Sequence, residues 1–308
     1  MRVLANLDCE ARWAGATLPH AVRARISLYA SLLAAFAPAG EPVEIWAPAA
    51  LDPARLLAAS GWAPPVMHAG ELADPDLAWA AASARDVNDR RFALSLAQAH
   101  AAALPGARVI ASADDLAMAR GAWIAKAAWT SAGRDRCRGD GPPTTEQRTR
   151  LTRLVAAFGP LVVEPWLDRI LDVGACARVD ADGRITAEPP HGLVTDARGG
   201  FLGIDLAPPA LLAHEHARLA EVVELVGRAL TTRGYAGPYA IDAFAYRDDD
   251  GARRFHPLCE INARYTFGWV AHALRRRCGT TRLGFAPAPS GAVPLIAPGA
   301  DGVTAWIA

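Results

Sequence analysis

The chain has 308 residues, of which 52% are hydrophobic, and its 32 acidic side chains balance 32 basic ones. This length and apolar content are enough for about two domains with a proper core. The balanced charge gives no reason to expect nucleic acid or an anionic membrane as the main partner. Five scattered cysteines without a CxxC pair indicate reduced thiols rather than a disulfide framework or a zinc site, and we expect a soluble, cytoplasmic protein.

The first 86 residues alternate between strand-like and helix-like patterns. We expect strands at 3–7 and 43–46, and helices at 21–36 and 52–60. This alternation favours a small, mostly parallel α/β domain. The segment has no GxGxxG turn, so nothing in it indicates dinucleotide binding.

The rest of the chain combines helices with strands that read as hairpins. Asn88 is the expected N-cap of a helix over 89–103, and Thr144 with Gln147 forms a capping box before a helix that ends at Gly159. Further elements are expected from the patterning, as helices at 114–120 and 212–233, strands at 108–111, 122–126, 161–164 and 171–179, and an irregular tail beyond 279.

Lys126 stands out because it is the only lysine among the 32 basic residues. It ends the strand-like run 122–126 and precedes a loop. A compact ammonium on a flexible stem suits phosphate oxygens in a way that arginine does not reproduce. The pattern therefore suggests a phosphate-binding lysine, with a neutral leftover as the alternative.

Two β-like runs, 239–246 and 255–262, flank the turn signal Asp248-Asp249-Asp250-Gly251 and predict an antiparallel hairpin. Period-two alternation places Asp242 on one face of its strand, and Glu260 with Asn262 on one face of the other. Cys259 is expected to point the opposite way, towards a core. If the polar faces coincide, their oxygens suit Mg²⁺; an ordinary half-exposed hairpin is the alternative.

The motifs between Asn88 and about Gly268, and their order along the chain, resemble those of the ATP-grasp superfamily of ATP-dependent ligases. Glu260-Ile261-Asn262-Ala263-Arg264 resembles its E-(I/V)-N-x-R strand, with Asp242 as the partner carboxylate. Lys126 resembles the family lysine on ATP phosphates. The resemblance implies metal ligands at Asp242, Glu260 and Asn262, and a catalytic role for Arg264 alongside Lys126.

The resemblance also implies a nucleotide site. Glu164-Pro165-Trp166-Leu167 resembles the hinge, where Glu164 would accept from the adenine amino group and the backbone near Trp166 and Leu167 would meet the ring edge. Asp172 falls at the position of the acid that binds ribose hydroxyls. Asn88-Asp89-Arg90 resembles the family N-D-K, so Arg90 is either a phosphate ligand or a surface arginine.

Two departures from the family pattern concern the phosphates. The loop 130–136 has a single glycine, Gly133, where the family loop is glycine-rich, and Arg134 or Arg136 could substitute charge for backbone contacts. Ala240 stands where some ligases carry an arginine, a charge that Arg264 could supply instead.

The implied fold is α/β: an N-terminal Rossmann-like domain (1–86), a small ATP-grasp lobe (87–160) and a large lobe with the metal site and tail (161–308). The implied reaction uses ATP and Mg²⁺, with Mn²⁺ possible, to convert a small-molecule carboxylate into an acyl phosphate. An amine or thiol then displaces phosphate. A degenerate ATP-binding scaffold and a kinase-like member remain alternatives, and substrates and oligomeric state stay unknown.

Overall fold

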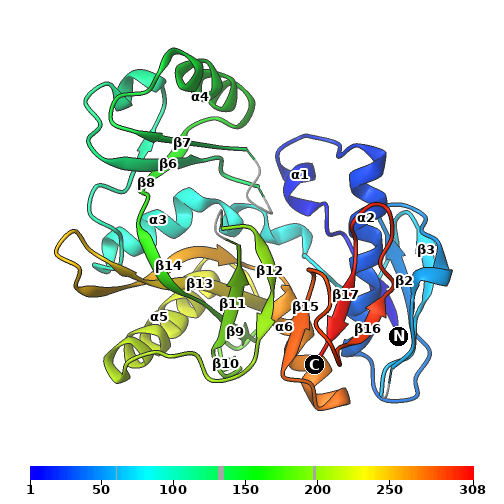
Figure 1. Ribbon diagram of the computed structural model, residues 1–308. Coiled ribbons are helices and arrows are strands. Elements are labelled where there is room, and N and C mark those ends of the chain that lie inside the picture. Colours follow the sequence, from blue (N-terminus) through cyan, green and yellow to red (C-terminus); the bar gives the residue numbers. More distant parts are fainter. Residues whose placement is uncertain (60, 131–134, 197–198) are drawn as a thin grey trace. The chain divides into compact units, whose positions relative to one another are not determined.

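The computed structural model describes residues 1–59, 61–130, 135–196 and 199–308. Its contacts divide the chain into two compact units (Figure 1). Unit 1 comprises Met1–Ala82, Glu188–Pro209 and Arg264–Ala308, and unit 2 comprises Ser83–Ala187 and Ala210–Ala263. Each unit therefore contains segments that lie far apart in the sequence. The division into three consecutive parts remains a prediction.

Unit 1 contains a four-stranded sheet built from the N-terminal segment. Its strands run in the order β3-β2-β1-β4, and every neighbouring pair is parallel. The bounds are β1 Arg2–Leu4, β2 Glu44–Ala47, β3 Val66–Ala69 and β4 Leu77–Ala78. The predicted parallel α/β domain is confirmed by this sheet and by the helices α1 (Cys9–Trp13) and α2 (His20–Ala30).

One helix prediction in unit 1 was wrong, and a second helix changes type along its length. The helix expected over 52–60 is a single 3₁₀ turn, η2 (Pro53–Arg55), and residue 60 lies outside the described residues. Leu56 is already extended, and Ala59 pairs with Trp62 in an isolated bridge. The expected helix 21–36 is α2 followed by the 3₁₀ segment η1 (Ser31–Phe36).

The tail is ordered, although its many Pro and Gly residues suggested an irregular surface segment. It forms three short strands that pair antiparallel with β12 and with one another, in the order β11-β12-β15-β17-β16. The elements are β11 His191–Thr195, β12 Phe201–Asp205, α6 Phe267–Cys278, β15 Arg282–Gly284, β16 Val293–Ile296 and β17 Ala305–Ile307. Burial explains the order, because Leu295, Ile296 and Ile307 join the apolar core of unit 1.

Unit 2 contains a first antiparallel sheet, in the order β5-β8-β6-β7, with α4 along it (Figure 1). The bounds are β5 Arg108–Ile110, β6 Ala122–Lys126, β7 Arg136–Asp140, α4 Thr145–Phe158 and β8 Leu161–Pro165. The predicted capping box of Thr144 and Gln147 is confirmed. Leu151 and Leu154 of α4 are buried in the apolar cluster beneath it. The expected helix 114–120 is a 3₁₀ turn, η5 (Ala113–Leu116).

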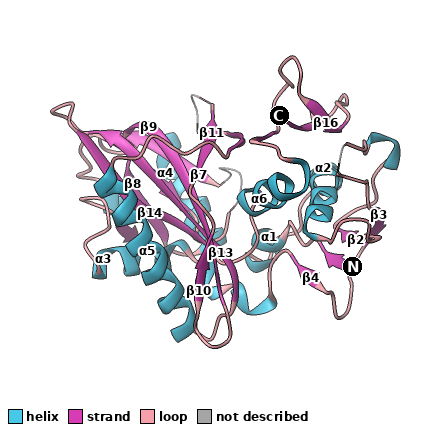
Figure 2. Cartoon of the chain, turned by 90° about the horizontal axis from the view of Figure 1, so that it is seen from below, coloured by secondary structure: helices cyan, strands magenta, loops and turns pink. Residues whose placement is uncertain are grey.

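The second sheet of unit 2 is also antiparallel, with β13 between β14 and β9 and with β10 paired to β9. Figure 2 shows helix α5 lying along these strands. The bounds are β9 Asp168–Val179, β10 Ile185–Ala187, α5 Ala213–Thr232, β13 Gly237–Arg247 and β14 Arg253–Asn262. The hairpin predicted from residues 239–246 and 255–262 is confirmed by β13 and β14. Among the described residues, no helix is both long and apolar enough to cross a bilayer.

Candidate functional site

The β13–β14 hairpin gathers the three predicted metal ligands on one face. Asp242 pairs directly with Glu260, and Asn262 pairs with Ala240 two residues further along the ladder. Directly paired residues project their side chains to the same side of a sheet. Asp242 and Glu260 are half-buried and Asn262 is buried. Two carboxylates and an amide thus share one partly shielded surface of unit 2.

The pairing of these strands is irregular just before Glu260. After the Asp242–Glu260 pair, the next partners are Phe244 and His256, so β14 contains extra residues that bulge outward. Pro257 lies in this bulge, and a proline inside a strand is the sequence signal for such a break, because it has no N–H to donate to the ladder. Regular alternation fails here.

Cys259 packs against the apolar cluster that contains Leu94 and Phe244, so the prediction that it points towards a core is confirmed, but it also borders the polar site. Its sulfur lies 3.8 Å from the ammonium nitrogen of Lys126 and 3.9 Å from a guanidinium nitrogen of Arg169. Because Cys259 immediately precedes Glu260, the lone lysine of the chain lies beside the metal-ligand strand.

Lys126 and Glu164, which lie on the neighbouring strands β6 and β8, form a buried ion pair. The Lys126 Nζ donates to a Glu164 carboxylate oxygen at 2.5 Å, and the two side chains are 14% and 8% exposed. The β6–β8 register places Lys126 opposite Val162 and Glu164 opposite Ile124, so the pair crosses the ladder diagonally. The sequence predicted both residues as nucleotide ligands but did not predict that they contact each other.

The charges of this pair stabilise one another. Burial alone lowers the pKa of Lys126, but its electrostatic interactions with Cys259 and Glu164 raise it above its usual value. Burial alone raises the pKa of Glu164, but the charge and hydrogen bond of Lys126 lower it below its usual value. Both groups are therefore ionised at neutral pH, with a cation ready to meet an incoming anion.

Arg90, at the start of α3 (Arg90–Ala99), connects three parts of unit 2. Its guanidinium donates to Glu260 at 2.9 Å, to the hydroxyl and carbonyl of Thr130 at 2.8 and 2.7 Å, and to the carbonyl of Ala127 at 2.8 Å. Arg90 is therefore a buried connector between the metal-ligand strand and the segment after Lys126, rather than a surface arginine.

Asn88 anchors the end of the same strand. Its side-chain oxygen accepts from the Ala263 amide at 2.9 Å, and its amide nitrogen donates to the carbonyls of Ala84 and Ala263. The N-cap of α3 is therefore Asp89, whose carboxylate accepts from the Arg91 amide, and the prediction of Asn88 as the cap was wrong. Asn88 is instead engaged with a partner distant in sequence.

Asp172 on β9 is held by Arg169, with 3.1 Å between carboxylate oxygen and guanidinium nitrogen. The Arg169 guanidinium also lies 3.9 Å from the centroid of the Phe244 ring, a cation–π contact. Arg169 was not expected from the sequence, since residues three apart on a strand ordinarily point to opposite faces. Arg169 links the predicted ribose acid to Cys259.

The predicted hinge residues follow β8. Trp166 donates its amide to the Ala122 carbonyl at 2.9 Å, and the Arg138 guanidinium stacks 3.5 Å from the centroid of its ring. Leu167 packs beside the apolar cluster that contains Phe244 and Val162. The hinge is thus fixed by backbone and packing contacts within unit 2.

Arg264, the predicted catalytic arginine, belongs to unit 1. Its guanidinium pairs with Glu10 at 2.5 Å and donates to the Tyr265 carbonyl at 3.0 Å. Both charged side chains are buried, at 12% and 9% exposure.

The structure describes only part of the loop 130–136. Thr130 contacts Arg90, and Arg136 is the partner of Lys126 in the β6–β7 ladder. Residues 131–134, which include Arg134, lie outside the described residues.

A small cavity of about 10 Å³ lies within unit 2 beside the Lys126–Glu164 pair. Its lining residues are of two kinds. The apolar ones are Leu94, Ala97, Ala103, Leu104, Val162 and Leu258, and the others are Arg90, Lys126, Glu164, His256 and Cys259. This volume is about that of one water molecule.

Several solved structures are similar to this chain over most of its length. Phosphoribosylamine–glycine ligase from Thermotoga maritima matches with a TM-score of 0.58 and 13% identity, over 100% of this chain and 90% of that one. Biotin carboxylase from Campylobacter jejuni matches at 0.55 and 13%, over 86% and 65%. L-amino acid ligase from Bacillus licheniformis matches at 0.52 and 12%, over 95% and 81%.

No protein-family model matches the sequence, and no curated protein matches it significantly. The similar structures are ATP-grasp enzymes, and their likeness shows the fold. The predicted fold class, α/β with the ATP-grasp arrangement and a parallel N-terminal sheet, is confirmed.

Proposed function

We propose that this chain, which has the ATP-grasp fold, is an ATP-dependent ligase that activates a substrate carboxylate for attack by an amine or thiol. One observation supports this most directly. The Lys126 ammonium contacts Cys259, the residue before Glu260, so the predicted phosphate cation and the predicted metal ligands lie at one place in unit 2. Convergence of a fixed cation with oxygen donors is what phosphoryl transfer requires.

In this proposal Lys126 neutralises phosphate oxygens of ATP, and Glu164 accepts from the adenine amino group. The two side chains now neutralise each other, and nucleotide binding would give Lys126 an anionic partner and Glu164 a neutral hydrogen-bond donor. Asp172 would accept from the ribose hydroxyls, while the backbone at Trp166 and Leu167 would line the base. Lys126 is thereby placed in advance, without the cost of orienting it during the reaction.

The oxygen face of the hairpin fits a hard cation. Asp242, Glu260 and Asn262 would hold Mg²⁺, or Mn²⁺, because carboxylate and amide oxygens are the ligands such ions prefer. When bound, the ion would neutralise charge on the phosphates. Glu260 already accepts from a cationic partner, Arg90, which holds it on this face. Arg90 would contribute by orienting Glu260, and Arg264 would hold the carboxylate or the transferred phosphoryl group.

The test is trapping with hydroxylamine. The chain is incubated with ATP, Mg²⁺ and a panel of carboxylates, and ADP and hydroxamate are both measured. Two of the similar structures are by name a glycine ligase and an amino acid ligase, so the panel starts with amino acids. An acyl phosphate yields hydroxamate with ADP, whereas a kinase-like member yields ADP and a stable phosphorylated product.

A matched pair of variants checks the site. Asp242→Asn should lower ADP formation by roughly a hundredfold, the typical loss of a preorganised electrostatic group. Asp249→Asn, at an exposed position in the turn of the same hairpin, is the control and should retain activity. Calorimetry with a non-hydrolysable ATP analogue and Mg²⁺ supplies a readout that needs no substrate. Absence of nucleotide binding by the wild-type chain would overturn the proposal.

A further inference from the structure

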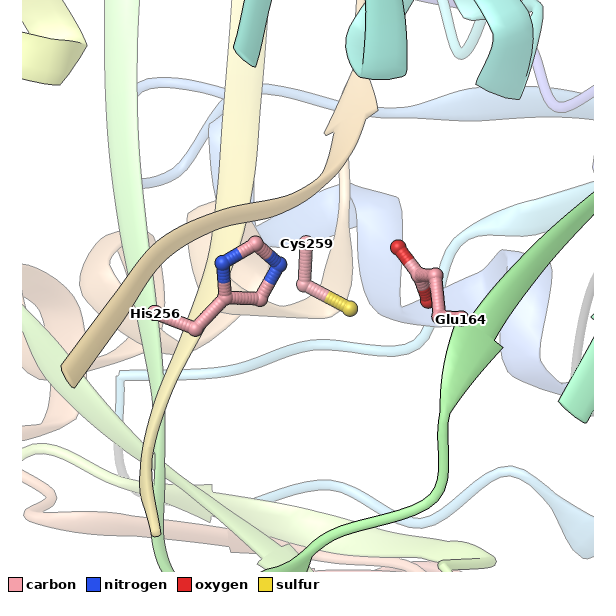
Figure 3. A group of neighbouring side chains, drawn as sticks. All are labelled: Glu164, His256 and Cys259. Carbon is pink, nitrogen blue, oxygen red and sulfur yellow. The ribbon is translucent and has the colours of Figure 1, made fainter. Parts of the chain in front are cut away.

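Three side chains around the small cavity of unit 2 form a cluster that the proposed ligase reaction does not use as a unit. They are Glu164 of β8 with His256 and Cys259 of β14, and their ligand atoms all lie within 4.8 Å of one another. Figure 3 shows the three side chains pointing toward one another. Regular alternation would place His256 and Cys259 on opposite faces, and the bulge at Pro257 brings them together.

The imidazole of His256 is oriented and has one unused nitrogen. Its Nδ1 lies 3.1 Å from the Ala102 carbonyl, which can only accept, so Nδ1 carries the proton. Nε2 therefore presents a lone pair. His256 is 2% exposed, and its Nε2 has no hydrogen-bond partner among the described residues. Such an orphan is rare in a folded interior and calls for a ligand.

This arrangement is typical of metal-binding histidines. A ligating imidazole usually donates its second nitrogen to a backbone carbonyl or carboxylate, which fixes the tautomer. Burial lowers the pKa of His256 to about 4, against the opposing charge of Glu164, so the ring is neutral at physiological pH. Nε2 is thus available as a donor atom without the loss of a proton.

The available space suits a single atom. The cavity beside the three side chains holds about 10 Å³, close to the volume of one water molecule and far below that of an aromatic ring. A sulfur, an imidazole nitrogen and a carboxylate oxygen are together the donors that Zn²⁺ takes, often as three protein ligands with a water in the fourth position.

We propose that Glu164, His256 and Cys259 bind one Zn²⁺ ion in exchange for the Lys126 ammonium. On binding, the Cys259 thiol releases its proton to solvent, and Glu164 exchanges its ion pair with Lys126 for the metal. Thiolate and carboxylate together match the two charges of the ion, and water completes the coordination. Spacing along the sequence does not reveal this site, because its donors come from two strands about 90 residues apart.

Zinc binding would compete with the proposed ligase reaction, since Lys126 and Glu164 are the predicted nucleotide ligands. A bound ion would occupy Glu164 and force the Lys126 side chain out of its buried position. Zinc would therefore inhibit nucleotide binding. The metal site itself does not depend on the proposed function, and its test uses neither ATP nor turnover.

The experiment is a titration of the full, metal-stripped chain with Co²⁺, an optical substitute for Zn²⁺. We expect one equivalent to give a thiolate-to-cobalt absorption band in the near ultraviolet, and added Zn²⁺ to abolish it. Cys259→Ala should lose the band and weaken Zn²⁺ binding by roughly a hundredfold or more. Cys278→Ala, which removes a thiol of unit 1 outside the cluster, should keep both. Absence of the band in the wild-type chain, or its survival in Cys259→Ala, overturns the proposal.

Lys126→Met supplies the opposite test, because the proposal makes the ammonium a competitor of the metal. Removing a like charge at this distance should tighten Zn²⁺ binding by roughly tenfold or more. Zn²⁺ should also raise the melting temperature of Lys126→Met more than that of the wild-type chain, a measurement that holds even if the variant is destabilised. Equal or weaker binding by this variant contradicts the exchange.

Discussion

Two buried ion pairs, one in each unit, hold the two cations assigned to catalysis. In unit 2, Lys126 pairs with Glu164, and in unit 1, Arg264 pairs with Glu10, each at 2.5 Å. A cysteine accompanies each pair: the Cys259 sulfur lies 3.8 Å from the Lys126 ammonium, and Cys9 donates to Glu10 at 3.3 Å. Charge, burial and a neighbouring thiol are thus common to both.

The cations themselves differ. Arg264 presents a planar guanidinium that binds Glu10, donates to the Tyr265 carbonyl and lies 5.6 Å from the centroid of the Trp79 ring. Lys126 contacts Glu164 and the Cys259 sulfur, and it borders a cavity. The planar guanidinium of Arg264 is held by several contacts, whereas the ammonium of Lys126, on a flexible side chain, can exchange its partner easily. We infer that the Arg264 pair stabilises unit 1 and holds this arginine in place for its proposed role, whereas the Lys126 pair can exchange its partner for a ligand.

The largest expected effect is the loss of stability when the Arg264–Glu10 pair is broken. Arg264→Met leaves the buried Glu10 without its cation, which should lower the free energy of unfolding by about 3–5 kcal/mol. Urea denaturation measures this loss. Glu10→Gln combined with Arg264→Met should recover most of it, because no buried charge remains. A loss under about 1 kcal/mol in the single variant would contradict a fixed, stabilising pair.

The next effect concerns the lysine pair and activity. Lys126→Ala should reduce ADP formation by roughly a hundredfold or more, as expected for a lost preorganised charge. Lys126→Arg keeps the positive charge but not the compact ammonium, so it should keep the fold and still lose most of the activity. Steady-state ADP release and circular dichroism report the two properties. Wild-type turnover in either variant would remove Lys126 from the proposed site.

A smaller effect appears in the pH dependence of stability. Burial alone raises the pKa of Glu10, but the Arg264 charge and hydrogen bonds from backbone and Cys9 lower it below the usual 4.5. A depressed pKa contributes stability above the unfolded value, and that contribution is lost as the pH falls through the folded value. The free energy of unfolding should therefore decrease below about pH 4.5, more steeply for the wild-type chain than for Glu10→Gln. Parallel pH profiles of the two proteins would refute the assignment.

The smallest effect sets the baseline for both pairs. Glu224 and Arg228 form an exposed pair on α5, at 3.5 Å and with side chains 51% and 65% exposed. Glu224→Gln should change the free energy of unfolding by less than about 1 kcal/mol, since solvent and salt screen such pairs. Urea denaturation at low and high salt checks this. A larger change would show that burial is not what separates this pair from the two buried ones.

Local rules determined much of the fold. The β6 strand ending at Lys126, the capping box of Thr144 and the β13–β14 hairpin depend on neighbouring residues alone, and the structure contains them as predicted. Alternation along each strand placed Asp242 on one face of its strand, and Glu260 with Asn262 on one face of the other. These are the parts of the candidate site that the sequence could predict.

Other parts depend on residues that meet only after folding. Cys259 meets Lys126 and Arg169, which are distant in sequence, at a bulge of β14 that strict alternation does not predict. Asp89 caps helix α3, and the Asn88 side chain is instead hydrogen-bonded to the backbone of Ala263. The tail became strands because its apolar side chains bury in the core of unit 1. Sequence proximity signals none of these contacts.

The sequence by itself determined which side chains can carry the chemistry: one lysine, and a hairpin with oxygen donors on one face. Only the tertiary structure decided their partners, pairing Lys126 with Glu164, Arg90 with Glu260 and Arg264 with Glu10. The physical reason is that a buried charge requires a neutralising neighbour within a few ångströms. In each of these pairs that neighbour comes from a distant part of the chain.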